Sequence, residues 1–188
     1  MQKSLKVTLL AVLASLGLVV AGCSSDGGDA SGPLKIGSLL PETGNLAFLG
    51  PPEFAGVDLA VKDINDAGGV LGNPVEHVRG DSGDTSTDIA QQTVDAHIAA
   101  GVSAIVGAAS SGVSLTVIDK ITSAGIVHFS PANTSPDLTT YADDGFYFRS
   151  APPDTFQGAV LGQLMAQDVS GQEAGGAGNA VFMNLDDA

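Results

Sequence analysis

Short apolar runs alternate with longer amphipathic segments along most of the chain. Apolar runs of strand length occupy residues 34–40, 75–79, 102–106, 126–129 and 146–148. The segments at 51–67, 84–100 and 113–124 repeat apolar positions every three or four residues, which is the period of an α-helix. Runs with few polar positions are typical of parallel strands that are covered on both faces. The alternation predicts an α/β fold, a doubly wound parallel sheet flanked by helices.

The spacing within the helical segments predicts which side chains face the sheet. In 51–67 the apolar positions are Phe54, Val57, Val61 and Ile64, which fall on one face of a helix. Two prolines stand at its start, where the first helical turn accepts them, and two glycines follow its end. In 84–100 the expected buried stripe is Ile89, Thr93, Ala96 and Ala100.

The pattern continues after residue 150 with one helix at 154–169 and one strand at 180–185. One helix and one strand cannot bury their own apolar faces, so they either pack on the preceding unit or belong to another domain. We expect a first α/β domain at 34–150 and the start of a truncated second domain at 151–188. The chain is therefore expected to be a fragment.

The N-terminus has the pattern of a secretory signal. Lys3 and Lys6 precede an apolar stretch that is too short to span a bilayer, and Ala21, Gly22 and Cys23 follow it. This pattern resembles a bacterial lipobox, so we expect a signal peptide at 1–22 and acylation of Cys23; the alternative is a secreted protein with a free thiol. Residues 23–33 are small, polar and acidic and read as a flexible tether. The protein is thus expected outside the cytoplasm, anchored to the membrane by lipid on Cys23.

Charge and cysteine content narrow the choice of partners. The chain has 7 basic and 21 acidic residues, a net charge of −14, so it lacks the basic patch that nucleic acid requires. Its single cysteine cannot form an intrachain disulfide. No group of His, Cys and carboxylates has the spacing of metal ligands, and no cofactor is expected.

Three loops that follow strands are rich in small or polar residues: 41–50, 107–114 and 130–138. Ligands of open parallel sheets bind beyond the carboxyl ends of the strands. The middle loop, GAASSGVS, brings the hydroxyls of Ser110, Ser111 and Ser114 to the start of a helix, where a carboxylate is favoured. For each serine taken alone, capping of the helix is an equal alternative.

The loop SPANTSP at 130–136 supplies a hydroxyl and turn carbonyls beside the middle loop. Carbonyl oxygens accept hydrogen bonds from an ammonium group. One loop with donors and a neighbour with acceptors suits a zwitterion, although this loop alone reads as an ordinary turn.

Several ordered segments resemble one family. They are LKIGSLLPETGNLAFLGPPEFAGVDLAVKDINDAGGVLGNPV, AIVGAASSGVSLTVID, HFSPANTSPDLT and FYFRSAPPDTFQGAV. They are similar to the first lobe of bacterial branched-chain amino-acid binding proteins, type I periplasmic binding proteins that serve ABC importers. The resemblance implies two lobes that close around a small amino acid or related carboxylate, and delivery to permease and ATPase subunits.

The resemblance also implies roles for individual residues. Ser111 would bind the carboxylate, Ala132 would offer its carbonyl to the ammonium group, and Thr134 its hydroxyl. Ser110, Ala109 and Asn133 would line the same wall. Leu49 stands where the family often has an aromatic contact, with Phe48 beside it.

Two other functions stay open on the sequence. A ligand-sensing receptor of the same fold is one, and an α/β hydrolase is the other. The hydrolase is disfavoured because the chain has no G-x-S-x-G, Walker A or G-x-G-x-x-G motif. His77, His97 and His128 fall on expected strands and a helix, so they read as structural, and we expect no catalysis.

Overall fold

The computed structural model describes residues 32–170, and within them five parallel strands form one sheet. In chain order these strands are β1 (Lys35–Leu40), β2 (Glu76–Asp81), β3 (Ala104–Gly107), β4 (Val127–Ser130) and β5 (Tyr147–Arg149). Their order in the sheet is β2-β1-β3-β4-β5, so the sheet extends to both sides of β1. The α/β fold with a doubly wound parallel sheet is confirmed.

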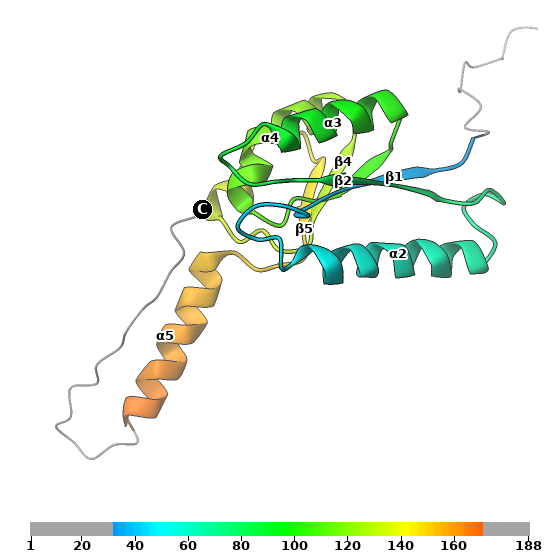
Figure 1. Ribbon diagram of the computed structural model, residues 1–188. Helices are drawn as coiled ribbons and strands as arrows, with labels where there is room; N and C mark the ends of the chain where they lie inside the picture. The colour runs from blue at the N-terminus through cyan, green and yellow to red at the C-terminus, as the bar shows by residue number, and fades with distance from the viewer. Residues whose placement is uncertain (1–31, 171–188) are drawn as a thin grey trace, which may run out of the picture. The chain divides into compact units, whose positions relative to one another are not determined.

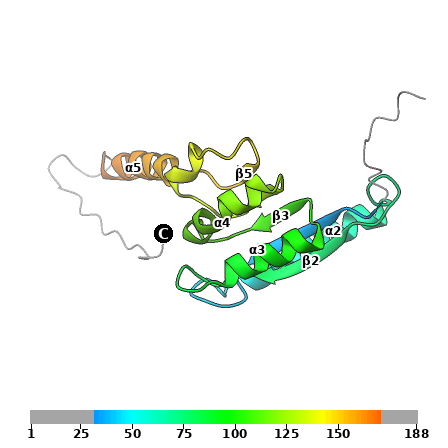
Figure 2. The same cartoon turned by 90° about the horizontal axis from the view of Figure 1, so that it is seen from above.

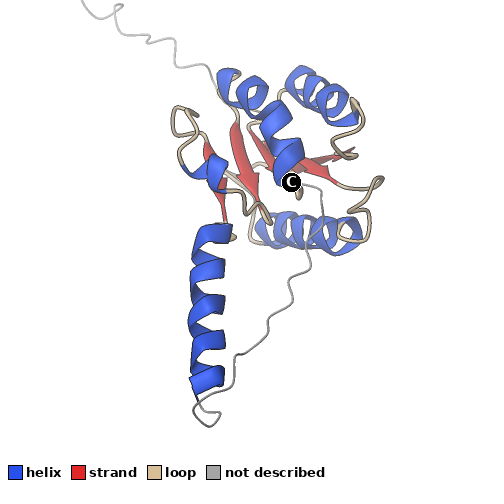
Figure 3. Cartoon of the chain, turned by 90° about the vertical axis from the view of Figure 1, so that its left-hand side faces the viewer, coloured by secondary structure: helices blue, strands red, loops and turns tan. Residues whose placement is uncertain are grey.

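Helices cover both faces of this sheet (Figure 1). They are α2 (Gly50–Asp66), α3 (Ile89–Ala100) and α4 (Ser111–Ser123). A short 3-10 helix η1 (Pro136–Thr139) precedes β5, and helix α5 (Asp154–Ser170) follows it. Helices α3 and α4 lie side by side on one face, as Figure 2 shows from above, and α2 lies on the opposite face (Figure 3). None of the described helices is long and apolar enough to cross a bilayer.

The main apolar core lies between the sheet and the α3–α4 pair. Leu39 and Ile105 enter it from the central strands and are fully buried. Val94 of α3 and Val117 and Ile121 of α4 meet them from above, also fully buried. A smaller cluster joins Ile118, Leu138 and Tyr147, so it ties η1 and β5 to α4. Both clusters fix the strand ends from which two of the three polar loops start: the second loop at 107–114 and the third loop at 130–138. The loop at 41–50 is the first loop.

The opposite face is covered only in part by the described residues. Val106, Phe129 and Phe148 are register partners across β3, β4 and β5, so their side chains share one face. Phe129 is 38% and Phe148 50% exposed. Between β1, β3 and β4 and the apolar stripe of α2 lies an almost wholly apolar groove of about 400 Å³. The α2 stripe therefore faces the sheet as predicted, but Ile64 stays 41% exposed.

Helix α3 differs from its prediction in start and in buried face. It begins at Ile89, because Asp84 is held in the preceding turn by the backbone N–H and hydroxyl of Ser86. Its buried residues are Ala90, Val94 and His97, and not the stripe through Thr93 and Ala96. Thr93 instead donates its hydroxyl proton to the carbonyl of Asp81, 2.7 Å away.

His97 occupies the buried face because the strand below it offers glycine. A Cβ added to Gly37 of β1 would lie 2.9 Å from Cδ2 of His97, so a side chain there would displace the ring. The His97 ring is also held by a hydrogen bond of 3.0 Å between its Nε2 and the carbonyl of Ser38. A polar ring thus fills a core position that sequence periodicity assigns to an apolar residue.

Several expectations lie outside the described residues. These are the signal peptide at 1–22, the acylated Cys23, nearly all of the tether at 23–33 and the strand at 180–185. The lobe boundary at residue 150 stays a prediction. In α5 the apolar side chains of Phe156, Val160 and Leu164 are 62%, 51% and 55% exposed.

The core assignment can be tested with Ile121→Ala. Removing this fully buried side chain is expected to lower the free energy of unfolding by about 2–5 kcal/mol, from lost burial and a residual cavity. Leu59→Ala on α2 is the control, because Leu59 is 58% exposed, and a change within about 0.5 kcal/mol is expected there. Urea unfolding followed by circular dichroism measures both. Equal losses would contradict the placement of the core.

Candidate functional site

The second and third loops meet because β3 and β4 are parallel neighbours. Both strands end at the same edge of the sheet, so residues 107–111 and 130–135 leave it side by side. A hydrogen bond joins the two loops near their starts, where the Ser130 hydroxyl donates to the Ala108 carbonyl at 2.7 Å. The sequence prediction that these loops form one wall is consistent with this pairing.

Ser111 is the contact between the two loops on the exposed side. Its Oγ accepts hydrogen bonds from the backbone N–H groups of Thr134, at 3.1 Å, and Ser135, at 3.2 Å. A serine hydroxyl has two acceptor lone pairs and one proton, so its acceptor capacity is filled. The remaining O–H can only donate, and it therefore requires an acceptor such as a carboxylate or water.

The position of Ser111 in α4 adds further donors. As the first residue of the helix, it has a backbone N–H without an intrahelical acceptor, as has Gly112. The helix dipole places partial positive charge at the same end. The partly exposed Ser111 thus presents an O–H and an N–H where an anion is electrostatically favoured.

The other two serines of the loop support the backbone. Ser110 is the N-cap of α4, and its hydroxyl accepts from the N–H of Val113 at 3.3 Å. Ser114 is fully buried and accepts from the N–H of Ala108 at 3.2 Å. Of the two alternatives left by the sequence, the structure shows capping for Ser110 and loop support for Ser114.

Ala132 and Thr134 are partly exposed beside Ser111. The N–H groups of Ala132 and Asn133 donate to the Ser130 hydroxyl, at 3.3 and 3.0 Å, which forms a tight turn. The Thr134 carbonyl accepts from the N–H of Asp154 at 2.8 Å, so this loop also holds the start of α5. The Ala132 carbonyl and the Thr134 hydroxyl are the groups expected to meet a ligand.

Asn133 lies behind this surface and not on it. Its side chain is fully buried, and Nδ2 donates to the carbonyls of Ala108 and Ala109, both at 3.0 Å. Its Oδ1 accepts from the Tyr147 hydroxyl at 2.9 Å. The expected position of Asn133 along the wall is therefore corrected to a supporting one, because no atom of it is exposed. Ala109, 5% exposed, is buried as well.

The first loop carries Phe48, which is 69% exposed, and Leu49, which is partly exposed and stands at the N-cap position of α2 without a side-chain hydrogen bond. Asp81 at the end of β2 holds this loop through the N–H groups of Glu42, at 2.9 Å, and Thr43, at 3.2 Å. Burial raises the pKa of the Asp81 carboxyl, but hydrogen bonds, first from the Thr43 hydroxyl, outweigh burial and lower it. The Asp81 carboxylate therefore acts as a brace for the first loop.

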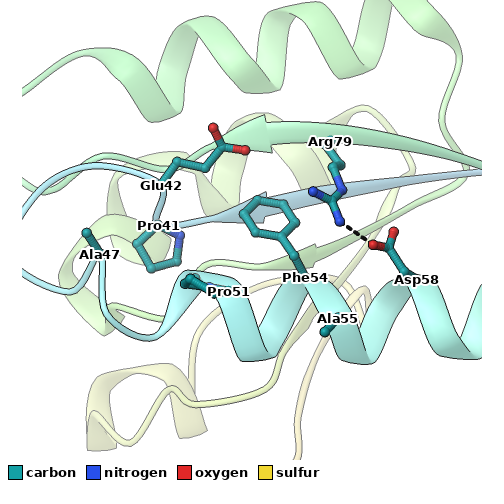
Figure 4. A pocket seen from close by; sticks show the side chains of 9 residues that line it. Pro41, Glu42, Ala47, Pro51, Phe54, Ala55, Asp58 and Arg79 are labelled. Carbon is teal, nitrogen blue, oxygen red and sulfur yellow. Dashed lines mark hydrogen bonds and ion pairs between the residues drawn. The ribbon is translucent and has the colours of Figure 1, made fainter.

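A cavity of about 520 Å³ opens on the α2 side of the first loop (Figure 4). Pro41, Glu42 and Phe54 line it together with Arg79, whose guanidinium lies 4.8 Å above the Phe54 ring. Arg79 is also paired with Asp58. Neither Ser111 nor Thr134 lines this cavity, so it is separate from the polar wall.

One hydrogen-bond chain has the order of a hydrolase triad. His77 Nε2 lies 2.8 Å from Ser38 Oγ, and His77 Nδ1 lies 2.8 Å from Asp58 Oδ1. Ser38 is fully buried in the middle of β1, so a substrate carbonyl has no access to its hydroxyl. The chain therefore joins β1, β2 and α2 within the fold, and it gives the hydrolase alternative no usable nucleophile.

The two remaining histidines are buried and neutral. Burial lowers the pKa of His97, against a hydrogen bond from its ring to Ser38. Burial also lowers the pKa of His128 to about 4, although the backbone of Gly107 acts to raise it. Neither ring nitrogen of His128 makes a hydrogen bond of normal geometry to the described residues. The His128 ring packs edge-on against Tyr147 at 5.1 Å. Within residues 32–170, no three His, Cys, Asp or Glu side chains gather as metal ligands would.

Comparison with known proteins places this chain in a family. The family model described as periplasmic binding protein matches residues 33–187. The chain belongs to this family of periplasmic binding proteins. A Leu/Ile/Val-binding protein homolog of Brucella abortus is 32% identical over 152 residues, which is 79% of this chain and 40% of the relative. The chain therefore spans about 40% of the length of that relative.

Solved structures agree. The branched-chain amino acid transporter substrate-binding protein LivJ from Streptococcus pneumoniae, in complex with isoleucine, is 34% identical with a TM-score of 0.67, over 73% of this chain and 39% of that one. An ABC transporter substrate-binding protein from Desulfitobacterium hafniense in complex with Leu is 32% identical with a TM-score of 0.61, over 72% and 39%. The relatives are thus substrate-binding proteins of branched-chain amino acid transport.

Burial of His128 predicts a pH-dependent stability. The unfolded chain binds the proton near pH 6.5, but the folded protein binds it only near pH 4. Between these values the unfolded state holds more protons, so stability falls as the pH falls, by up to about 3 kcal/mol from this residue. Asp58 and Asp81 have pKa values lowered from 3.8 in the folded protein, so their contribution to stability is lost only below about pH 3.8.

Urea unfolding of the wild type and His128→Gln across pH 7 to 4 measures this effect. The variant should show a clearly shallower slope, with a remainder from His97, whatever its stability at pH 7. Identical slopes would show that His128 is not the group responsible.

Proposed function

We propose that residues 34–150 form the first lobe of an extracytoplasmic substrate-binding protein of an ABC importer. Its ligand is a branched-chain amino acid or a related small amino acid. The observation that carries the proposal is the Ser111 hydroxyl: both its lone pairs are occupied by N–H groups of the neighbouring loop, so its proton is directed to an external acceptor. The α-carboxylate of an amino acid is such an acceptor.

The remaining groups of the wall fit the rest of the ligand. The Ser111 N–H and the helix dipole would stabilise the carboxylate. The Ala132 carbonyl and the Thr134 hydroxyl would accept hydrogen bonds from the ammonium group. Phe48 and Leu49 would contact the ligand side chain from the first loop. A second lobe would close over the ligand from the other side, since this chain covers only 39–40% of the length of these relatives, two of which are seen in complex with isoleucine or leucine.

The proposal includes the cellular setting. Signal cleavage before Cys23 and its acylation would tether the protein to the membrane outside the cytoplasm. There it would deliver ligand to permease and ATPase subunits, and it would carry out no chemical reaction itself. The similarity of this chain to a transporter substrate-binding protein and to a Leu/Ile/Val-binding protein homolog supports this role.

Amide NMR titration of the 188-residue chain tests the ligand class. Leucine, isoleucine and valine should shift the backbone signals of Ser111 and Thr134 with weak affinity, because one lobe supplies only part of the contacts. Ser111→Ala should weaken leucine binding about tenfold or more, since a charge-assisted hydrogen bond is lost. Ser123→Ala, at the exposed far end of the same helix, should bind as the wild type does.

A sugar and a simple fatty acid serve as ligand controls and should leave these signals in place. If no amino acid shifts Ser111 or Thr134 up to its solubility limit, the proposed ligand class is wrong. If leucine binds equally to Ser111→Ala, the assigned carboxylate site is wrong.

A further inference from the structure

We propose that Asn133 and Tyr147 are positioning residues that set the ligand-binding geometry of the two loops from behind. This inference rests on the proposed function, because it concerns how the same wall is held. Neither side chain is exposed to a ligand: Asn133 is 0% and Tyr147 8% exposed. They act through the backbone groups that they hold.

The Asn133 amide joins three elements. Its two N–H bonds point at the carbonyls of Ala108 and Ala109 in the second loop, both 3.0 Å from Nδ2. Its carbonyl oxygen accepts from Tyr147 on β5 at 2.9 Å. Carbonyls only accept and this tyrosine hydroxyl donates, so one orientation of the amide satisfies every partner. Burial raises the pKa of Tyr147 to about 12, which keeps the donated proton in place.

Peptide planarity carries this constraint to the second loop. The Ala109 carbonyl belongs to the same rigid peptide plane as the N–H of Ser110, the cap of α4. Holding the Ala109 oxygen therefore fixes the plane directly before the cap. The direction in which Ser111 enters the helix and presents its N–H and hydroxyl follows from that plane.

The same reasoning applies to the third loop. The N–H of Asn133 points inward and donates to Ser130 Oγ at 3.0 Å. In a trans peptide the carbonyl of the preceding residue points the opposite way, so the Ala132 carbonyl points away from Ser130. Asn133 thus fixes the acceptor for the ammonium group with its backbone and the donors for the carboxylate with its side chain.

Tyr147 is itself held firmly. Its ring packs with Ile118 of α4 and Leu138 of η1, and against the edge of the His128 ring at 5.1 Å. This packing holds the hydroxyl in one place. This makes the tyrosine a fixed reference from which the Asn133 amide, and through it both loops, take their position.

Tyr147→Phe removes the reference hydroxyl and keeps the packed ring. We expect leucine affinity, measured by NMR titration of the 188-residue chain, to fall about threefold to tenfold, the range for one lost hydrogen bond. Tyr141→Phe is a matched control, since it removes a tyrosine hydroxyl bond to Asp119 at the surface, and it should leave affinity unchanged. Thermal denaturation is recorded for both variants.

A double-mutant cycle separates positioning from general stability. If Tyr147 acts through Asn133, then Tyr147→Phe should weaken binding in the wild type but have little further effect in Asn133→Ala. A ligand-free signature accompanies it: the Asn133 side-chain NH₂ signals should be protected from exchange in the wild type and lose protection in Tyr147→Phe.

The outcomes are distinguishable. If the wild type binds no amino acid, the proposed function fails and the positioning role falls with it. If the wild type binds leucine and Tyr147→Phe binds it equally, only the positioning role is overturned. Additive losses of affinity in the double variant would also overturn it, because the two residues would then act independently.

Discussion

The hydrogen bonds between the 107–111 loop and the 130–135 loop are the interaction on which the site depends. A ligand the size of an amino acid touches both loops only if their separation is fixed to within a fraction of a hydrogen-bond length. Ser111 joins the loops at the exposed surface, and Asn133 joins them in the interior. Because the outer bond consumes the acceptor capacity of Ser111, the bracing of the loops also creates the donor offered to a ligand.

The parallel sheet makes this arrangement possible. Adjacent parallel strands end at the same edge, so loops that are distant in sequence become neighbours, and each is anchored by an element with a buried side. The core beneath α3 and α4 fixes β3 and the start of α4, while the Tyr147 cluster fixes β5 and η1. The groove beside α2 and the apolar face of α5 stay open within the described residues, and Pro131 of the 130–135 loop lines that groove.

Much of this organisation is predictable from the sequence, because it follows from period and composition. The strand and helix order, the sheet class and the grouping of the 107–114 loop with the 130–136 loop follow from apolar runs and from where hydroxyls stand after them, whereas the individual roles of Ser111 and Thr134 are implied by the family resemblance. The buried polar contacts do not follow, since they depend on partners far along the chain. His97 occupies a core position only because Gly37 lies beneath it, and Asp81 serves the first loop only because β1 and β2 pair in register. Asn133 looks like a turn residue until the Tyr147 hydroxyl is placed beside it.

Charge gives a reason why such a wall suits a zwitterion. The chain carries a net charge of −14, which repels free anions at long range and attracts cations. An amino acid has no net charge, so this field neither excludes it nor concentrates it, and recognition is left to short-range dipoles. In the proposed function, Ser111 and the start of α4 would supply those dipoles for the carboxylate without a lysine or arginine, and the 130–135 loop would supply carbonyl and hydroxyl oxygens for the ammonium group. A simple carboxylate would meet the same donors but would pay the repulsion and leave the acceptors unpaired, so the wall discriminates between them by both terms.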